Sequence, residues 1–358
     1  MAAFTEGGRS LASGAVCPAP RNDQERVQLG HGSGGKMSAR LLEERFLPRF
    51  GNRHLSPLGD GAVVPVSGEE IVISTDSFVV SPLEFPGGNI GHLAVHGTVN
   101  DLAMMGADPT YLSAGFILEE GLSFEVLDRI LDAMTEAADA AGVAVVTGDT
   151  KVVDRGKADG MFINTTGVGM LHAGFRPNPQ GVCPGDAVVV SGPIGRHGMA
   201  IMAVREGFAF DAEIRSDSAN LAPVVAALRR DLGGAVHCLR DATRGGLASA
   251  LNEIASASGV GMELEDGRVP VPEPVAGACE MLGLDPLYVA NEGVLVAMVA
   301  AEVAQKAVDI LRNHPVAAEA AVIGTVVESH PGMVVLLTGV GGTRVVDTLP
   351  GDQLPRIC

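Results

Sequence analysis

The chain has 358 residues, 46% of them hydrophobic and 19% charged, so it is too apolar for a disordered protein and long enough for two domains. Asp and Glu number 43 against 25 Lys and Arg, which gives a formal net charge of −18 at pH 7. Such an acidic surface repels phosphate backbones and anionic lipid, which argues against nucleic acid or a membrane as the main partner.

Cysteine usage indicates a reducing compartment. The five cysteines are scattered, odd in number and without a CxxC motif, so neither a disulfide framework nor a zinc ribbon is expected. The first 25 residues lack the apolar core of a signal peptide, and the longest apolar run, Gly293–Ala301, is too short to span a bilayer. We therefore expect a cytoplasmic protein.

In chain order, short β-branched runs alternate with longer amphipathic stretches from Val27 onward. This pattern predicts an α/β or α+β protein with mixed sheets, in which several strands pair antiparallel. Strands are expected at Ile71–Thr75, Val143–Thr147, Ala187–Ser191 and Val236–Arg240, and in a hairpin of Met333–Thr338 and Thr343–Val346. Helices are expected at Ile90–Met105, Phe124–Ala141, Met199–Glu206, Leu247–Ser258 and Glu302–Asn313.

A segment rich in Pro, Gly and Asn, Ala173–Gly185, interrupts both periodicities and predicts a domain boundary. We expect a flexible extension over residues 1–26, a first domain over 27–175 and a second over 176–346. Residues 347–358 contain two prolines and little to bury, so they predict a mobile arm. Fully extended, this arm could reach roughly 40 Å at about 3.3 Å per residue, enough to cross between domains.

Four aspartates share one local setting, at or near a strand end or loop and among small residues. They are Asp60 in LGDGAVV, Asp76 in ISTDSF, Asp101 in VNDLAMMGAD and Asp241 in LRDATRGGL. Carboxylates placed in this way suit a hard cation such as Mg²⁺. A single Asp beside a Gly is usually a turn residue, and only the joint appearance of four favours the metal interpretation.

Three glycine-rich segments could hold phosphates, because backbone amides at a helix start point at anions. They are His31–Lys36 (HGSGGK), Gly192–Gly198 (GPIGRHG) and Arg244–Gly246 (RGG). HGSGGK lacks the spacing of a P-loop and GPIGRHG does not match GxGxxG. Neither a Walker site nor a dinucleotide-binding fold is predicted.

Two further polar positions interrupt apolar surroundings. Asp149 and Lys151 follow an expected buried strand, where a lysine can neutralise a phosphate, although a solvated lysine on a turn is the alternative. Glu292 interrupts the apolar stretch Tyr288–Ala300 and needs a partner or a role there. A site carboxylate is favoured over a salt-bridged structural one.

His92 and His96 lie four residues apart on an expected helix, which is the spacing of metal ligands. The sequence supplies neither the Glu of an HExxH motif nor a third ligand nearby. Packing histidines are therefore the favoured interpretation.

Cys358 is the last residue, on a proline-punctuated segment and behind an arginine. Packing gives no reason for a thiol at this position. An accidental terminal residue is one interpretation. The other is a carrier thiol that takes up a group and brings it into a distant pocket as substrate.

Taken together, the motifs resemble one family. HGSGGKM, LGDGAVV, STDSF, GTVNDLAMMGADP, TGDTKVV, RDATRGGL, NEG and a terminal PRIC follow one another here in the order seen in the HypE family of hydrogenase maturation factors. The resemblance runs from about Val27 to Cys358. This family belongs to the superfamily of aminoimidazole ribonucleotide synthetase, selenophosphate synthetase and thiamine-monophosphate kinase, so the ATP-site motifs discriminate less than PRIC.

The resemblance implies two α/β domains, a homodimer formed through the sheets of the N-terminal domain, and ATP in a cleft between the domains. It implies that Asp60, Asp76, Asp101 and Asp241 hold Mg²⁺ against the phosphates. It places Cys358, Lys151 and Glu292 at the reacting group. It assigns nucleotide binding to His31, Gly32, Gly34, Gly35, Lys36, Asn100, Asp149 and Thr150.

The reaction implied by the resemblance begins with a carbamoyl group that the carbamoyltransferase HypF places on Cys358. ATP then drives dehydration of this group to a thiocyanate. The cyano group passes to iron on the HypC–HypD complex, for the [NiFe]-hydrogenase centre. In this scheme Lys151 offsets charge on the γ-phosphate and Glu292 takes the nitrogen proton.

Two other functions remain open at this point. A small-molecule kinase of the same superfamily, making selenophosphate or thiamine diphosphate, would share the aspartates, but HGSGGK lacks the cysteine or selenocysteine of selenophosphate synthetases. A non-catalytic scaffold that presents its tail to partners would leave the four aspartates without a purpose.

Overall fold

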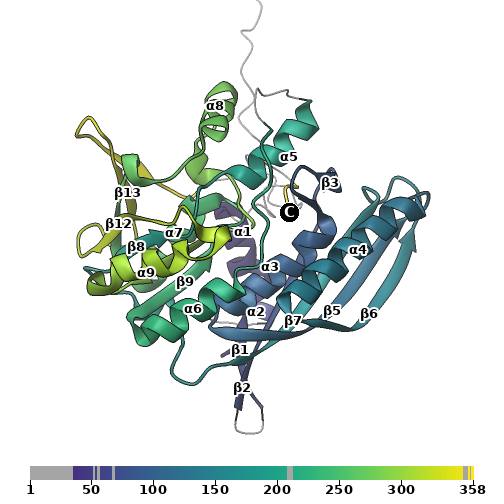
Figure 1. Cartoon of the computed structure of the whole chain (residues 1–358), viewed down its shortest axis with the longest axis horizontal. Coiled ribbons are helices and arrows are strands. Elements are labelled where there is room, and N and C mark those ends of the chain that lie inside the picture. Colours follow the sequence, from purple (N-terminus) through teal and green to yellow (C-terminus); the bar gives the residue numbers. More distant parts are fainter. Residues whose placement is uncertain are drawn as a thin grey trace, which may run out of the picture.

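The computed structural model describes most of the chain. Its described residues are 35–50, 53–54, 57–66, 69–207, 213–349, 354 and 356–358. Two large sheets with their helices lie side by side, and the C-terminus lies inside the molecule near β3 and α5 (Figure 1). The predicted extension 1–26, with Cys17, falls outside the described residues.

The first sheet is mixed and has five strands in the order β1-β2-β7-β5-β6. Its strands are β1 (Ala62–Val66), β2 (Glu69–Phe78), β5 (Ala107–Glu119), β6 (Ala144–Val153) and β7 (Met161–Leu171). Strands β5 and β6 run parallel, and the other neighbours pair antiparallel. Helices α3 (Ile90–Met104) and α4 (Phe124–Ala141) pack on this sheet (Figure 1). A small hairpin of β3 (Glu84–Phe85) and β4 (Gly88–Asn89) precedes α3.

The second sheet has seven strands in the order β14-β13-β10-β12-β8-β11-β9. Its strands are β8 (Ala187–Val190), β9 (Val236–Asp241), β10 (Gly261–Glu265), β11 (Leu295–Val299), β12 (Ala321–Val327), β13 (Val334–Leu337) and β14 (Thr343–Val346). Only β10 and β13 pair parallel within it. Five longer helices belong to this half: α5 (Arg196–Glu206), α6 (Ala222–Leu232), α7 (Gly246–Ser258), α8 (Glu273–Leu282) and α9 (Ala304–Arg312).

Local signals explain where the helices begin and end. The side-chain oxygen of Asn89 accepts the N–H groups of Gly91 and His92 and starts α3, and Ser123 caps α4 in the same way. Gly142 ends α4 in the left-handed region at φ 68°. Near the start of the described chain, α1 (Lys36–Leu41) and α2 (Leu47–Phe50) flank a π-helical turn, Leu42–Phe46.

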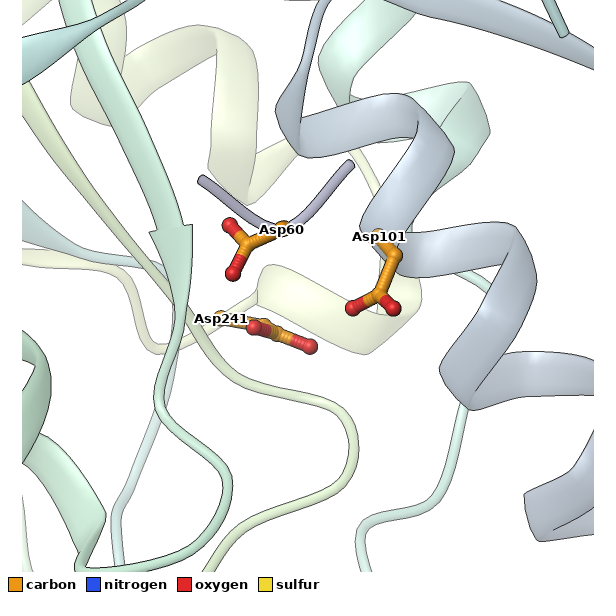
Figure 2. Close-up of side chains that lie close together, drawn as sticks. All are labelled: Asp60, Asp101 and Asp241. Carbon is orange, nitrogen blue, oxygen red and sulfur yellow. The ribbon is translucent and has the colours of Figure 1, made fainter. Parts of the chain in front are cut away.

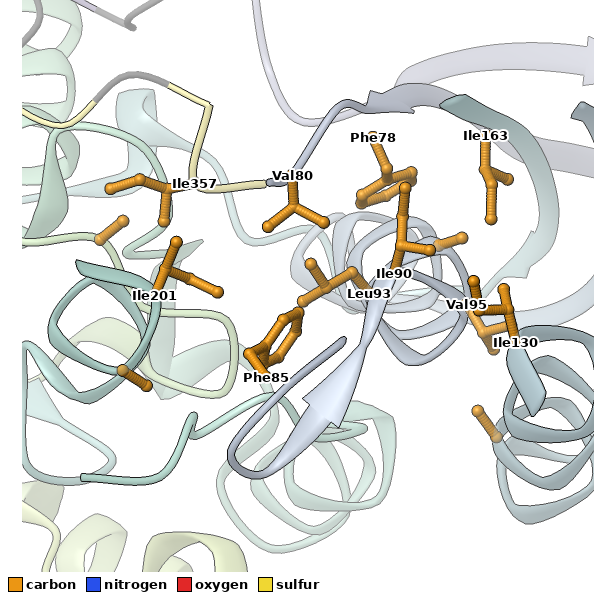
Figure 3. Close-up of a cluster of buried hydrophobic side chains, with 14 of the residues drawn as sticks. Phe78, Val80, Phe85, Ile90, Leu93, Val95, Ile130, Ile163, Ile201 and Ile357 are labelled. Atoms are coloured by element: carbon orange, nitrogen blue, oxygen red, sulfur yellow. The ribbon is translucent and has the colours of Figure 1, made fainter. Parts of the chain in front are cut away.

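One hydrophobic cluster crosses from the first half of the molecule to the second. It joins Phe78 and Ile90 of the first half to Ile201 of α5, and the C-terminal Ile357 belongs to it as well (Figure 3). These side chains are nearly or fully buried. The two halves therefore share a core, and the end of the chain is part of it.

The predicted fold class is confirmed, since the structure has two α/β halves with mixed sheets. The expected strands and helices are present, with ends that differ by at most three residues, except around Val143–Thr147. That run was expected to be a buried strand that ends before Asp149. The observed strand β6 extends to Val153 and is exposed along nearly its whole length.

The predicted domain boundary lies between the end of β7 at Leu171 and the start of β8 at Ala187, and its bounds stay a prediction. Among the described residues, Cys183, Cys238, Cys279 and Cys358 are free thiols. Within the same residues, none of the helices has the length and apolar character needed to cross a bilayer.

Candidate active site

Three of the four predicted aspartates converge on one point. Asp60 lies in the loop before β1, Asp101 in the last turns of α3, and Asp241 at the end of β9, with their carboxylates turned toward a common space (Figure 2). One oxygen from each lies within 4.8 Å of the others. The setting of Asp101 differs from the predicted strand end or loop, because it lies on a helix.

Burial and mutual repulsion act on this cluster. Burial, with the charges of neighbouring carboxylates, raises the pKa of Asp60 to about 6 and of Asp241 to about 7. The same causes raise the pKa of Asp101 well above its usual value. Carboxylates held so close are stabilised by a cation between them, and carboxylate oxygens are the ligands that Mg²⁺ prefers. The three side chains therefore fit a magnesium site.

Two neighbours hold the aspartates in place. The hydroxyl of Ser74 lies 2.6 Å from Oδ2 of Asp101 and 2.8 Å from the carbonyl oxygen of Asp60. Arg240 forms ion pairs with Asp60 and with Glu253. Sequence reasoning missed both residues, since Ser74 lies 27 positions from Asp101 and nothing local marks it.

Asp76 stands apart from the other three aspartates. It lies near the end of β2, its Oδ1 accepts the N–H of Ser77 at 2.7 Å, and Arg244 approaches it at 3.7 Å. Its charge nevertheless contributes to the raised pKa of both Asp101 and Asp241. Asp76 is thus a neighbour of the three-carboxylate cluster, and its role as a ligand stays a prediction.

The C-terminal thiol lies near Asp76 and Glu292. Cys358 is hydrogen-bonded to Glu292, and the charges of Arg244, Glu292 and Asp76 act on its sulfur. Burial raises the pKa of the Cys358 thiol above its ordinary value, and Glu292 adds to this rise. Burial, with the charges of Asp76 and other carboxylates, raises the pKa of Glu292 well above its usual value. With the bare arm docked, burial therefore favours the protonated form of both groups.

A loop between α5 and α6 supports Glu292. Oδ1 of Asp217 accepts the main-chain N–H of Glu292 at 3.2 Å, while Oδ2 is buried without a partner among the described residues. A Cβ on Gly293 would stand 1.8 Å from the carbonyl oxygen of Asp217, so only glycine permits this approach. Burial raises the pKa of Asp217 to about 6. Sequence reasoning did not find Asp217, because its partner lies 75 positions away.

Asn100, expected to bind nucleotide, is buried in α3 and contacts the same loop. Its Nδ2 donates to the carbonyl of Ala219 at 3.0 Å, and its Oδ1 accepts the N–H of Leu221 at 2.8 Å. The glycine-rich segment Gly192–Gly198 is also tied to this region, since the N–H of Gly195 donates to Oδ1 of Asn291 at 2.6 Å.

Asp149, Thr150 and Lys151 lie elsewhere, inside the exposed strand β6. Nζ of Lys151 bonds to both carboxylate oxygens of Asp149, at 2.7 and 2.5 Å. The sheet register sets Asp76 level with Gly148, with β7 and β5 between them. Three strand spacings of about 4.8 Å put β6 roughly 14 Å from β2. One chain therefore does not bring Lys151 to Cys358.

The predicted nucleotide loop is described only in part. His31, Gly32 and Gly34 lie outside the described residues. Gly35 is buried, and the exposed Lys36 pairs with Asp347 at 2.5 Å. The main-chain N–H of Lys36 donates to the carbonyl of Leu349, so this loop adjoins the start of the arm.

His92 and His96 occupy packing positions in α3. Nδ1 of His96 lies 3.0 Å from the hydroxyl of Ser218, and Nδ1 of His92 lies 3.2 Å from Oδ1 of Asn89. Burial lowers the pKa of His96 to about 4. Among the described residues, the aspartate cluster is the group whose geometry suits a metal ion, and the two histidines are not in it.

Comparison with known proteins assigns the chain to a family. The family models for AIR synthase related proteins match residues 58–171 with their N-terminal domain and residues 183–337 with their C-terminal domain. A carbamoyl dehydratase HypE of Cupriavidus necator is 53% identical over 334 residues, covering 93% of this chain and 95% of its own. The HypE of Escherichia coli is 46% identical, covering 93% of this chain and 99% of its own. This chain belongs to the HypE family.

Solved structures agree with that assignment. A HypE–HypF complex has a TM-score of 0.82 at 46% identity, covering 86% of this chain and 99% of that one. A HypE in complex with ATP has a TM-score of 0.79 at 48% identity, covering 93% of this chain and all of that one. A thiamine monophosphate kinase from Aquifex aeolicus, 17% identical at a TM-score of 0.63, shares the fold alone.

Proposed function

We propose that this protein uses ATP to dehydrate a carbamoyl group carried on Cys358 to a thiocyanate, and so supplies cyanide ligands for the iron of [NiFe]-hydrogenase. The observation that carries the proposal is the position of the C-terminal thiol, hydrogen-bonded to Glu292 and close enough to Asp76 for that charge to act on the sulfur. A terminal cysteine placed there can present its own cargo to a nucleotide. Relatives at 46–53% identity are named carbamoyl dehydratase.

The chemistry needs phosphate as a leaving group. An amide oxygen leaves poorly as hydroxide, but transfer of the γ-phosphoryl group turns it into the oxygen of a phosphate. The S–C(=O)–NH₂ group then loses two nitrogen protons and this phosphate, leaving S–C≡N with ADP and phosphate as the other products. Glu292 lies beside the sulfur, and its raised pKa makes it, once ionised, a stronger base toward those protons than an exposed carboxylate.

Nucleotide and metal would occupy the space around the aspartates. Asp60, Asp101 and Asp241, with Asp76 beside them, would hold Mg²⁺, which lowers the repulsion between phosphate oxygens and the attacking group. The proposed nucleotide contacts are the loop His31–Lys36, Asn100 and the pair Asp149 and Thr150. A related HypE solved with ATP supports nucleotide binding in this fold.

To reach a reacting group, Lys151 needs a second copy of the chain. Among the described strands, β6 pairs with β5 alone, and it exposes Val145, Val146 and Val152. An unpaired edge strand with apolar side chains is a surface suited to a partner sheet. In the proposed homodimer, β6 of one copy is covered by the other, and Lys151 reaches the reacting group of the second copy. Each site is then built from two chains.

The proposed partners follow from the reaction. HypF would load the carbamoyl group onto Cys358, and a complex of a related HypE with HypF supports this step. The HypC–HypD iron complex would accept the cyano group. We place these events in the cytoplasm, with residues 27–175 as the ATP-binding and dimerisation domain, 176–346 as the second domain and 347–358 as the arm.

The alternatives account for less. A small-molecule kinase of this fold gives no reason for the C-terminus to lie against Glu292. A scaffold that presents its tail would keep Cys358 outside the protein, whereas Ile357 beside it is 3% exposed.

Mass spectrometry of the C-terminal peptide tests the proposal. Protein carbamoylated on Cys358 is expected to lose one water from this peptide when ATP and Mg²⁺ are present, and to keep its mass when either is omitted. Cys358→Ala, treated in parallel, is expected to show no change. An unchanged wild-type peptide with ATP and Mg²⁺ would refute the proposed reaction.

A further inference from the structure

The last three residues bond through their main chain to the segment that follows β2. The main-chain N–H of Val79 donates to the main-chain oxygen of Cys358 at 3.1 Å, and that of Ser81 donates to the carbonyl of Arg356 at 3.3 Å. As the residue number rises from 79 to 81 in one segment, it falls from 358 to 356 in the other, so the two segments run antiparallel. The end of the arm is therefore bound through its main chain, in antiparallel register with residues 79–81.

Helix α5 binds two carbonyl groups of the last three residues, those of Arg356 and Ile357. Nε2 of His197 lies 2.8 Å from the carbonyl oxygen of Ile357. Nη2 of Arg205 donates to the carbonyl of Arg356 at 2.7 Å and to that of Ser81 at 2.6 Å. Arg205 thus joins the arm to the segment with which it pairs. Together these contacts engage a main-chain oxygen of each of the last three residues.

Apolar contacts fix the register of the same segment. His197, Ile201 and Arg205 are spaced by four residues, which puts them on one face of α5. Ile201 lies between the two polar residues and belongs to one buried cluster with Ile357 and Val80 (Figure 3). A one-residue slip of the arm would turn Ile357 out of this cluster and move the thiol by about 3.3 Å.

The protonation state of His197 suits this contact. Complete burial lowers the pKa of His197 to about 4, so its ring is neutral near pH 7. A carbonyl oxygen only accepts hydrogen bonds, so Nε2 carries the proton toward Ile357. Nδ1 then accepts from the hydroxyl of Ser216, 2.8 Å away.

The arm itself does not favour this conformation. Arg356 has φ 58°, in the left-handed region, which is unfavourable for a residue other than glycine. Contacts outside the arm must offset that cost. The end of the arm is held by hydrogen bonds, by the ion pair of Arg356 with Asp159 and by the buried side chains of Leu354 and Ile357.

We infer that His197, Ile201 and Arg205 form a dock for the C-terminal arm and position the Cys358 thiol beside Glu292, an inference that rests on the proposed function. The dock binds the arm through main-chain oxygens and Ile357, groups that carbamoylation and dehydration of the thiol leave unchanged. It therefore accepts the bare, the carbamoylated and the dehydrated arm alike. His197, Ile201 and Arg205 are therefore positioning residues. Discrimination between the bare, the carbamoylated and the dehydrated thiol depends on the groups around the sulfur.

Thiol alkylation measures docking without any ATP chemistry. Bare full-length protein is treated with iodoacetamide, and labelling of Cys358 is followed by mass spectrometry, with the exposed Cys183 as internal reference. Arg205→Met and, separately, Ile357→Ala are expected to raise the Cys358 labelling rate about tenfold or more, because the freed thiol ionises more readily. Ile357→Ala changes only the arm, so it tests the dock without altering α5.

Matched variants sharpen this result. Arg205→Lys keeps the charge but lacks the fork that binds two carbonyl groups, so labelling between wild type and Arg205→Met is expected. Val204→Ala, on a half-exposed neighbour in α5, is expected to label as wild type does. Unchanged Cys358 labelling in both Arg205→Met and Ile357→Ala would overturn the dock.

A second readout separates the dock from the proposed reaction. On carbamoylated protein, Arg205→Met is expected to slow loss of water from the arm in a single turnover and to leave the KM for ATP unchanged. Wild-type speed in that variant would overturn the positioning role. If wild type itself loses no water while the labelling differences persist, the proposed reaction fails and the dock stands.

Discussion

The buried centre and strand β6 carry residues of one predicted site in opposite environments. Glu292 is 4% exposed and Asp241 is 7% exposed, whereas the side chains of Lys151 and Asp149 are 68% and 71% exposed. The first pair is enclosed by elements of its own chain. The second lies on an edge strand with nothing described beyond it. The fold of one chain therefore completes only part of the site.

This contrast indicates different roles for the buried centre and for strand β6. Within one chain, the centre gathers carboxylates and the thiol at one point and shields them from water, which strengthens every charge interaction there. Strand β6 keeps its polar groups in solvent, where an ion pair such as Asp149 with Lys151 contributes little to stability. In the proposed dimer, Lys151 is enclosed only when the second chain covers β6.

The largest effect is expected in the buried centre. Asp101→Asn should lower magnesium-dependent ATP turnover by about 100-fold or more, because a metal ligand and its charge are lost. The same variant should be at least as stable as wild type without Mg²⁺, since one of three repelling carboxylates is removed. Phosphate release and denaturant titration measure the two properties. Full turnover in Asp101→Asn would contradict the metal assignment.

Mixing two inactive variants tests whether β6 acts on the second copy. Lys151→Ala and Cys358→Ala should each be inactive alone. After unfolding and refolding together, random pairing makes half of the dimers mixed, and each mixed dimer has one intact site, so about a quarter of wild-type activity is expected. No recovery, with mixed dimers demonstrated by mass, would place Lys151 and Cys358 of one chain in the same site.

The exposed strand itself can be tested for association. Val146→Glu puts a charge on an edge that the proposed partner covers, so it should convert dimer to monomer in light scattering with little change in the unfolding midpoint. Met281→Glu, on α8 at 74% exposure, is a control that should leave the mass of the assembly unchanged. A dimer retained in Val146→Glu would remove β6 from the interface.

Sequence reasoning reached the parts of the site that carry a local signal. Small residues around Asp60 and Asp241, and a thiol at the very end of the chain, were visible without a fold. Ser74 and Asp217 were not, because each acts on a residue far away in sequence. The β-branched run at Val143–Thr147 predicted a buried strand, and the burial was wrong: a strand forms there, but β6 is exposed along nearly its whole length in the described part of the chain.

The smallest expected effect is a difference in how protein stability depends on pH. It compares a carboxyl group in the buried centre with one on the exposed strand β6. Burial raises the pKa of Asp217 from 3.8 to about 6, so the folded protein binds a proton there more tightly than the unfolded chain. Its contribution to stability is therefore greatest at low pH and declines as pH rises toward 6 and beyond. A shift of this size corresponds to about 3 kcal/mol at full ionisation, an order-of-magnitude figure.

Asp217→Asn removes this titration. Relative to wild type, the variant should gain stability between pH 5 and pH 8, as measured by urea unfolding at both values. Asp149→Asn is the matched control on β6: its Lys151 partner lowers the pKa of Asp149, so that group stays ionised throughout this range and the difference from wild type should not depend on pH. If the stability difference from wild type depended on pH equally in both variants, burial in the centre would not raise the pKa of Asp217 relative to an exposed carboxylate on β6, and the contrast between the two environments would be wrong.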